Sequence, residues 1–288
     1  MTRLLAFFGH HKCASTWIHN ILDAIAADAG WRLAYLFNEE LFDCDLARYI
    51  ERERIDFLSY VNADQKHVDS LPEHRGFHVV RDPRDLIASA YFSHKNSHPT
   101  ETWPELVGHR EKIATLSKDA ALFEEMEFNA HFIDHIATWN YDQPHVLELK
   151  QEEFTTDPYL GFLRVFEFLG ALDEEHHNKR AQVRYLMQAT TNILNRLSRG
   201  WWPLRVPMDT IPGERVMAVA YDNRFQKFSK GRAKGKVDDK SHYRKGVGGD
   251  WINHFTPEHV AAFKERWPGL VSRLGYEADE SWAAGSPS

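Results

Sequence analysis

A short apolar run near the start of the chain is followed at once by a turn and then by a helical pattern. Residues 4–8 are apolar, Gly9 ends the run, and apolar residues recur at helical spacing from Ile18 to Ile25. The run is far shorter than the roughly 18 to 20 apolar residues of a membrane helix, and too short for a signal peptide. Its length is typical of a buried β-strand, so residues 9–17 are expected to form the first βα loop, where α/β proteins place their chemistry.

Two further segments, residues 76–80 and 145–149, repeat this pattern of an apolar strand followed by a helix. Such alternation predicts a parallel sheet with helices packed on both faces, and thus an α/β fold. Proline marks three helix starts, because it lacks the N–H that the first helical turn leaves unpaired. The N-cap residues before these prolines are Asp82, Asp157 and Thr256.

The rest of the pattern indicates one domain. Amphipathic stretches at residues 117–139 and 159–168 supply further helices, and we find no internal repeat and no low-complexity linker. We therefore expect a single domain over residues 1–276, followed by a frayed tail over residues 277–288.

Composition excludes several classes of protein. The hydrophobic fraction of 43% is enough for a buried core, which excludes disorder as the main state. The 35 basic and 42 acidic residues give a net charge of −7, which argues against a nucleic-acid binder and against a basic membrane-surface protein. The two cysteines, Cys13 and Cys44, exclude a disulfide scaffold and favour a reducing, cytoplasmic location.

Charge is unevenly distributed near the C-terminus. Residues 227–245 hold eight basic and two acidic side chains, inside a chain that is acidic as a whole. This segment is interpreted either as a mobile anion-binding loop or as an ordinary solvated loop. It ends in Arg244, Lys245 and Gly246, and the glycines that follow are typical of a loop that can close over a ligand.

Two earlier segments also suit phosphate groups. In the first βα loop, Lys12 precedes the hydroxyls of Ser15 and Thr16 at a helix start, where free backbone N–H groups attract anions. The loop is not a Walker A sequence, because the lysine precedes the hydroxyl pair and no second glycine is present. Arg81 stands at a strand end with Ser89 in the following helix, a pairing of guanidinium and hydroxyl that suits a phosphate monoester.

Four motifs together resemble one enzyme family. Residues 12–17, Lys-Cys-Ala-Ser-Thr-Trp, resemble the Lys-Ser-Gly-Thr-Thr-Trp loop of the sulfotransferases that use 3′-phosphoadenosine-5′-phosphosulfate (PAPS). Residues 81–85 with Ser89 resemble that family's 3′-phosphate motif, and residues 244–251 resemble its C-terminal Arg-Lys-Gly-x-x-Gly-Asp-Trp motif. Residues 146–158 are similar to its strand followed by Glu-Asp-x-x-x-Asp-Pro. The motifs follow the family's order along most of the chain.

The resemblance implies a three-layer, P-loop-like α/β domain with a central parallel sheet flanked by helices. It implies a sulfotransferase that moves a sulfuryl group from PAPS to a hydroxyl of a small or medium acceptor and releases 3′-phosphoadenosine-5′-phosphate (PAP). Sulfuryl transfer is an in-line displacement in which charge builds on the leaving oxygen, so Lys12 and the helix dipole are expected to stabilise that oxygen. This scheme requires no metal.

The residues that the resemblance assigns to the cofactor are Lys12, Cys13, Ala14, Ser15, Thr16, Trp17, Arg81, Ser89, Gln151, Asn223, Phe225, Arg244, Lys245 and Gly246. Phe225 would pack on the adenine. Ala14 stands where the family has glycine, which makes the loop less permissive. Gln151 replaces a tyrosine on the adenine side. Arg84 and Asp85 are interpreted as surface charges.

Seventeen histidines make the catalytic base ambiguous. His98 is favoured because it opens His-Pro-Thr-Glu-Thr-Trp, which resembles a stretch that bears the catalytic histidine in cytosolic members, and His94 is the alternative. His94 with His98, and His131 with His135, are spaced as zinc-binding pairs on a helix. The spacing shows no third ligand for either pair, so no metal site is expected.

Two other functions stay open. A nucleotide kinase or NTPase on a similar scaffold would need a Walker A sequence, and a non-catalytic binder of adenosine bisphosphates would need the cradle alone. The acceptor is not readable, although Phe37, Trp103, Trp201 and Trp202 are candidates to line its pocket. The oligomeric state is also open, because Ile252 and Pro257 stand where the family's dimer motif has other residues.

Overall fold

The computed structural model describes residues 3–101, 103–173, 179–199, 201–224, 227, 229, 231, 235, 236, 238 and 248–285. The chain divides into two compact units, and each is built from two separate stretches of sequence. The first unit comprises residues 1–80 and 139–224, and the second comprises residues 81–138 and 225–288. Among the described residues, no helix has both the length and the apolar content needed to cross a bilayer.

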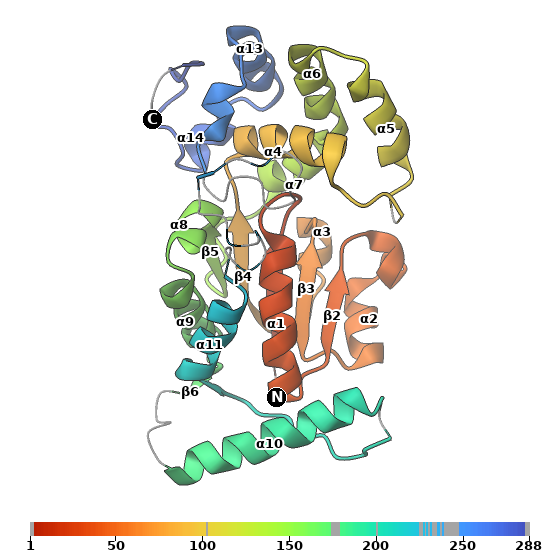
Figure 1. Ribbon diagram of the computed structural model, residues 1–288, viewed down its shortest axis with the longest axis vertical. Helices are drawn as coiled ribbons and strands as arrows, with labels where there is room; N and C mark the ends of the chain where they lie inside the picture. The colour runs from red at the N-terminus through yellow and green to blue at the C-terminus, as the bar shows by residue number, and fades with distance from the viewer. Residues whose placement is uncertain are drawn as a thin grey trace. The chain divides into compact units, whose positions relative to one another are not determined.

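A five-stranded parallel sheet lies at the centre of the first unit (Figure 1). Its order is β2-β3-β1-β4-β5, so β1 and the loop that follows it are central. The strands are β1 (Leu4–Gly9), β2 (Leu33–Leu36), β3 (Phe57–Val61), β4 (His74–Val80) and β5 (Val146–Lys150). The three strands expected from the sequence are confirmed as β1, β4 and β5. The sequence did not predict β2 and β3, which are short.

Helices cover both faces of this sheet because successive strand residues point to opposite sides. Ala6 and Phe8 share one apolar cluster with residues of η1 (Glu39–Phe42), α2 (Leu46–Glu53) and α3 (Gln65–Val68). On the other face Phe7 stacks on Phe77, and α1 (Ser15–Ala29) and α9 (Pro158–Leu169) pack against the strands. The expected α/β fold, with a central parallel sheet flanked by helices, is confirmed.

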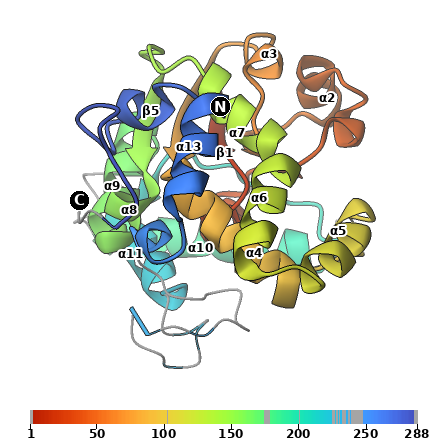
Figure 2. The same ribbon diagram turned by 90° about the horizontal axis from the view of Figure 1, so that it is seen from above.

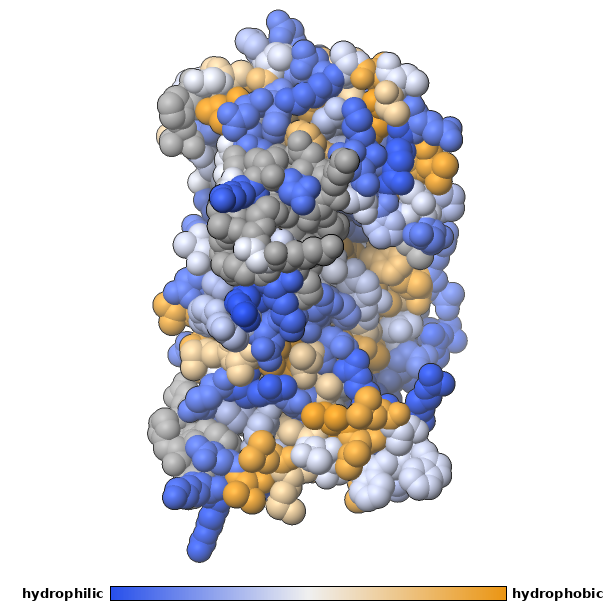
Figure 3. All heavy atoms as spheres, viewed as in Figure 1, coloured by the Kyte–Doolittle hydropathy of each residue, from blue (hydrophilic) through white to orange (hydrophobic). Residues whose placement is uncertain are grey.

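Further elements of the first unit pack on the α1 side. They are α8 (Gln151–Thr156), α10 (Lys179–Leu197), α11 (Gly213–Asp222), and a parallel pair of β6 (Leu172–Asp173) and β7 (Ile211–Pro212). Both α10 and α11 contact α1, and α11 also contacts α9. Asn192 of α10 is buried and donates to the carbonyls of Asp28 and Val206. The exposed apolar side chains of α10 include Leu186 and Met187. Figure 3 shows apolar surface over this helix.

The described part of the second unit is helical (Figure 2). Its elements are α4 (Pro83–Asn96), α5 (Glu105–Ala114), α6 (Lys118–Phe128), α7 (Ala130–Thr138), η2 (Asp250–Asn253), α13 (Pro257–Arg266) and α14 (Leu270–Arg273). Helix α4 contacts α5, α6 and η2. The amphipathic stretch at 117–139 is thus two helices, because the first ends at Asn129, whose side chain bonds back to Glu125.

The three helix starts predicted from proline are confirmed. The Asp82 carboxylate accepts from the Arg84 amide at 2.9 Å, and the Asp157 carboxylate accepts from the Leu160 amide at 3.1 Å. The amide of Thr256 donates to Nδ1 of His259 at 3.0 Å, which forms a capping box. Each cap supplies hydrogen-bond partners at a helix end that has too few of its own.

Two expectations about the second unit need correction. Arg84 and Asp85 are not surface charges, because each is only 1% exposed. Two residues of the segment expected to fray instead pack: the Glu277 carboxylate accepts from Arg84 at 2.7 Å, and Trp282 is buried. The aromatic side chain supplies apolar area that a free tail would leave in water.

Candidate functional site

The loop between β1 and α1 has the backbone of an anion cradle. Lys12 and Ala14 both take left-handed conformations, with φ of 61° and 60°, which fold the loop tightly. Ala14 is the N-cap of α1, and no side chain caps this helix end. The amide of Ile18 bonds to the Ala14 carbonyl, so the three preceding amides of the first turn are the ones without intrahelical partners. This end of α1 can therefore receive an anion.

Side chains of the loop have different exposures. Thr16 is exposed and Lys12 is half-buried, so both can reach a ligand. Ser15 is buried and donates its hydroxyl to the His10 carbonyl at 2.9 Å, which fixes the loop. Cys13 is fully buried and its Sγ lies 3.5 Å from the His11 carbonyl oxygen. The Cys13 thiol therefore serves packing, and a ligand can meet only the backbone of this residue.

Trp17 links the loop to two segments expected on the adenine side. Its Nε1 donates to the Asn223 carbonyl at 2.8 Å, and its ring packs on Phe154 of α8 and on Phe162. Gln151 begins α8, and its Oε1 is buried with no hydrogen-bond partner among the described residues. A ligand donor is one way to satisfy such an atom. Trp17, Gln151 and Asn223 thus belong to one neighbourhood of the first unit.

A buried polar chain begins at the residue that precedes this loop's tight turn. Nε2 of His10 lies 2.7 Å from Nε2 of His78, and Nδ1 of His78 lies 2.5 Å from the Glu148 carboxylate. The other oxygen of Glu148 accepts from Nε1 of Trp139 at 2.8 Å. His78 and Glu148 are direct partners in the β4–β5 register. These hydrogen bonds fix the side chain of His10, whose carbonyl accepts the hydrogen bond from Ser15.

Asp85 joins two of the motifs within the second unit. Its carboxylate accepts from the amides of Gly249 and Trp251 at 2.6 and 2.7 Å, and Nη2 of Arg81 lies 3.7 Å away. The start of α4 is thereby bonded to the Gly-Asp-Trp end of the C-terminal motif. Ser89 is half-buried on α4. Of the residues expected to bind the 3′-phosphate, Arg81 and Ser89 are the ones that the structure describes.

Arg84 is a structural residue of this same region. Its guanidinium carbon lies 3.9 Å from the ring centroid of Trp251 and 4.6 Å from that of Trp282. The guanidinium also donates to Asp82 and Glu277. Stacking and ion pairing together compensate a charge that would otherwise be costly to bury.

The two candidate bases differ in exposure. His94 is fully buried, and its Nδ1 lies 2.9 Å from Oε2 of Glu125. His98 is partly exposed, and its Nδ1 lies 2.9 Å from the Pro99 carbonyl. Burial would raise the pKa of Glu125, but hydrogen bonds from His109 and His94 outweigh it and hold that pKa at about 2. His94 is thus tied to an ionised carboxylate.

Comparison with known proteins decides the family. The profile of the sulfotransferase domain matches residues 7–199, which is more than half of the chain. The chain belongs to the sulfotransferase domain family. A curated relative, cytosolic sulfotransferase 3 of Arabidopsis thaliana, is 25% identical over 131 residues. That match spans 44% of this chain and 33% of the relative.

Two solved structures are also similar to this sulfotransferase-family chain. Mouse sulfotransferase SULT7A1 complexed with PAP is 19% identical, with 95% of this chain and 86% of that chain covered and a TM-score of 0.46. Retinol dehydratase in complex with androsterone and the inactive cofactor PAP is 14% identical, with 93% and 80% covered and a TM-score of 0.47.

Some expected site residues of this sulfotransferase-family chain lie outside the described residues, and some buried ones were missed. Phe225, Arg244, Lys245 and Gly246 lie outside, as does most of the basic segment 227–245. The hydrogen-bonded set of His10, His78 and Glu148 was not predicted from the sequence. Its signal was one polar residue flanked by apolar ones in each of two strands, His78 in β4 and Glu148 in β5.

Proposed function

We propose that this protein transfers a sulfuryl group from PAPS to a hydroxyl of a small or medium organic acceptor. The uncapped start of α1, with Lys12 in the loop before it, is the observation that carries the proposal. A helix end with free amides, a nearby lysine and an exposed threonine hydroxyl has the donors that a phosphosulfate needs. The sulfotransferase domain match supports the same reaction.

PAPS supplies an activated sulfuryl group, and the residues present fit it. The amides of Ser15, Thr16 and Trp17 would hold the 5′-phosphosulfate, with the Thr16 hydroxyl as a further donor. Lys12 would place its ammonium at the bridging oxygen. The buried, unsatisfied Oε1 of Gln151 is suited to accept a hydrogen bond from the adenine side. Arg81 and Ser89, with Arg244, Lys245 and Gly246, would hold the 3′-phosphate.

The chain's own residues have two catalytic tasks. Lys12 and the amides of α1 stabilise negative charge on the leaving bridge oxygen as the bond from sulfur to that oxygen breaks. A base removes the acceptor's proton as its oxygen bonds to sulfur. Both tasks depend mainly on positioning, because the displacement needs no covalent bond to the protein.

We assign the base to His98, because a base must reach the acceptor. His98 is partly exposed, whereas His94 is fully buried and bonded to Glu125. With its Nδ1 proton donated to the Pro99 carbonyl, His98 has Nε2 as the nitrogen that takes the proton. The half-buried ring of Trp103 packs edge-on against the ring of His98, so it orients the base.

PAP release in the presence of PAPS and a panel of phenols and alcohols tests this function. The wild-type chain should release PAP only with an accepted hydroxyl compound. Lys12→Met should lower turnover at least about 100-fold, the usual cost of losing one preorganised stabiliser, and change PAP affinity much less. Lys66→Met is the matched control, since Lys66 is exposed and pairs with Glu39. Near wild-type turnover in Lys12→Met would remove Lys12 from its role.

The same assay separates the two histidines from each other and from a surface histidine. His98→Gln should slow turnover about 100-fold or more, as expected for loss of a general base. His131→Gln, at an exposed position of α7, should leave it unchanged. A His98→Gln chain as active as the control would show that another group takes the proton.

A further inference from the structure

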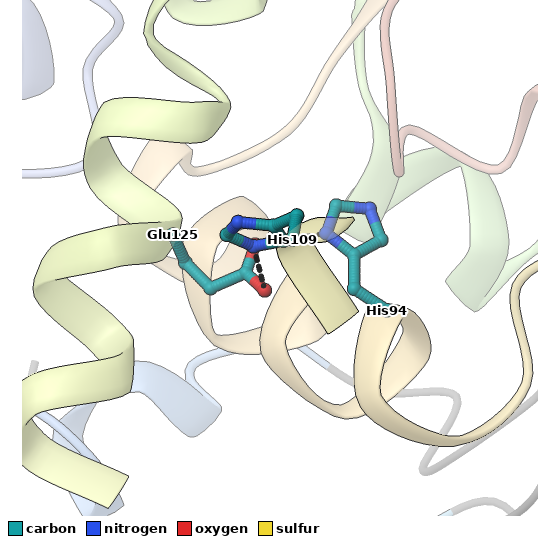
Figure 4. Close-up of side chains that lie close together, drawn as sticks. All are labelled: His94, His109 and Glu125. Atoms are coloured by element: carbon teal, nitrogen blue, oxygen red, sulfur yellow. Dashed lines mark hydrogen bonds and ion pairs between the residues drawn. The ribbon is translucent and has the colours of Figure 1, made fainter. Parts of the chain in front are cut away.

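Three helices of the second unit direct one carboxylate and two imidazoles at a single point. His94 comes from α4, His109 from α5 and Glu125 from α6, and Figure 4 shows the three side chains facing one another. Nδ1 of His94 lies 2.9 Å from one oxygen of Glu125, and Nε2 of His109 lies 2.9 Å from the other. All three side chains are buried.

The geometry is that of a donor set for a metal ion. One ligand atom from each residue lies within 4.8 Å of the others, and the set is the only such group among the residues that the structure describes. Two histidine nitrogens with one carboxylate are a common zinc ligand set, with water in the fourth position. Magnesium and calcium prefer oxygen ligands, so a transition metal suits this set better.

Neighbouring residues hold the donors in place. Nδ2 of Asn129 donates to Oε2 of Glu125 at 2.8 Å, and the ring of His109 stacks on Phe128 with centroids 3.8 Å apart. Arg110 donates to the His94 carbonyl at 2.5 Å. Contacts of this kind, made to the ligand residues by their neighbours, fix the orientation of metal ligands and are a usual part of metal sites.

Charge also favours a cation here. A fully buried carboxylate is costly unless a positive charge compensates it, and the nearest partners are two imidazoles and one amide. A divalent ion between the three ligands compensates the carboxylate directly.

We propose that His94, His109 and Glu125 form a binding site for a zinc-like divalent transition metal that joins α4, α5 and α6. The sequence could not indicate it, because His109 and Glu125 are 16 residues apart and lie on different helices. The site shares no residue with the proposed PAPS cradle or with His98. Its role is to tie together the helices of the second unit.

Zinc titration of the full chain after treatment with a chelator tests the proposal. The wild-type chain should bind one zinc ion per chain, and metal analysis after gel filtration should recover it. Glu125→Gln and His109→Gln should each weaken this binding by more than about 100-fold, since even changes behind the ligands cost about 10- to 100-fold. The control His131→Gln keeps the cluster intact and should bind like the wild type.

Cobalt binding is a second measurement, and its signal does not depend on how stable each variant's fold is. Co²⁺ added to the chelated wild type should give the intense visible absorption of a four-coordinate site, and His109→Gln should lack it. Absence of stoichiometric zinc in the wild type would overturn the proposal. So would equal zinc binding by wild type, His109→Gln and Glu125→Gln, because the ion would then sit on other histidines. PAP binding in His109→Gln tests the proposed function separately.

Discussion

Ala14 has a backbone conformation that is unfavourable for a residue with a Cβ atom. It takes φ of 60°, a region in which a Cβ costs an L-residue roughly 1–2 kcal/mol. It does so where the resembling loop of the family has glycine, which reaches this conformation freely. The conformation leaves the first amides of α1 without a side-chain cap. The strain is therefore located in the loop that we propose binds the donor.

Ala14→Gly should raise the free energy of unfolding by about 1 kcal/mol or slightly less. Relief of the left-handed strain exceeds the cost of a more flexible unfolded chain, which is about 0.4–1 kcal/mol. Ala24→Gly, in the middle of α1, is the matched control and should lower stability by about 1 kcal/mol. Urea unfolding of both variants gives the signs, and a loss of stability in Ala14→Gly would contradict the strain argument.

Arg84 shows the limit of local sequence at the residue scale. A charged residue after Asp-Pro at a helix start reads as a surface group, and the caps at Asp82 and Asp157 were predicted correctly from that same pattern. The burial of Arg84 depends on Trp251 and Trp282, far along the chain. Contacts of such long sequence separation leave no local pattern, so the sequence could not show them.

Arg84→Ala should lower the free energy of unfolding by about 3–5 kcal/mol, because it leaves the Asp82 carboxylate buried without its partner. Arg266→Ala is the control, since Arg266 and Glu127 form an exposed pair that contributes at most about 1 kcal/mol. Denaturant unfolding measures both. If both variants lost the same free energy of unfolding, the buried interactions of Arg84 would contribute no more than the exposed ion pair of Arg266.

At the scale of elements, strand β4 begins with a histidine whose protonation affects the stability of the fold. The strand begins with His74, which is 9% exposed, and whose Nδ1 lies 2.9 Å from the Pro72 carbonyl. Nε2 of His74 is buried and has no hydrogen-bond partner among the described residues. Burial lowers the pKa of His74, and the nearby His145 lowers it further, although the bond to Pro72 acts in the opposite direction.

The stability of the chain should therefore fall on the acid side. A histidine whose folded pKa lies below the unfolded value of about 6.5 binds a proton more readily in the unfolded chain, so the free energy of unfolding decreases as the pH drops through that range. His74→Gln keeps a donor for the Pro72 carbonyl and cannot be protonated. Urea unfolding at pH 8 and pH 5.5 should show a smaller loss for His74→Gln than for the wild type. Equal losses would exclude His74 as a source of acid sensitivity.

Elements were predictable where the pattern was long or carried a specific residue. The strands β1, β4 and β5 and the three proline-marked helices were found because apolar runs or caps identify them locally. The strands β2 and β3 were missed because an apolar run of four or five residues is ambiguous by itself, and the helix that follows each of them first has only four residues. Strand β5 is as short as β3, but the helical pattern at residues 159–168 follows it. The single amphipathic stretch at 117–139 was split by the side chain of Asn129, which the apolar pattern does not reveal.

At the scale of the whole chain, motif order carried more information than any one motif. The loop of residues 12–17, Arg81 and the Gly-Asp-Trp segment were each ambiguous alone, and their order indicated the family that the domain match then established. The buried sets were not predictable, because the partners of Glu125 and of Glu148 come from different elements. The roles of Arg244, Lys245 and Gly246 stay predictions.

Binding of PAP separates PAPS-dependent sulfuryl transfer from nucleotide phosphoryl transfer, since it asks whether the chain recognises a 3′-phosphate without a metal. Calorimetric titration with PAP, and in parallel with ADP and with ATP, each with and without magnesium, makes the comparison. We expect a Kd for PAP of about 1 μM or tighter without metal, and much weaker binding of ADP and ATP. Preference for ATP with magnesium would contradict it and would favour a nucleotide kinase or NTPase.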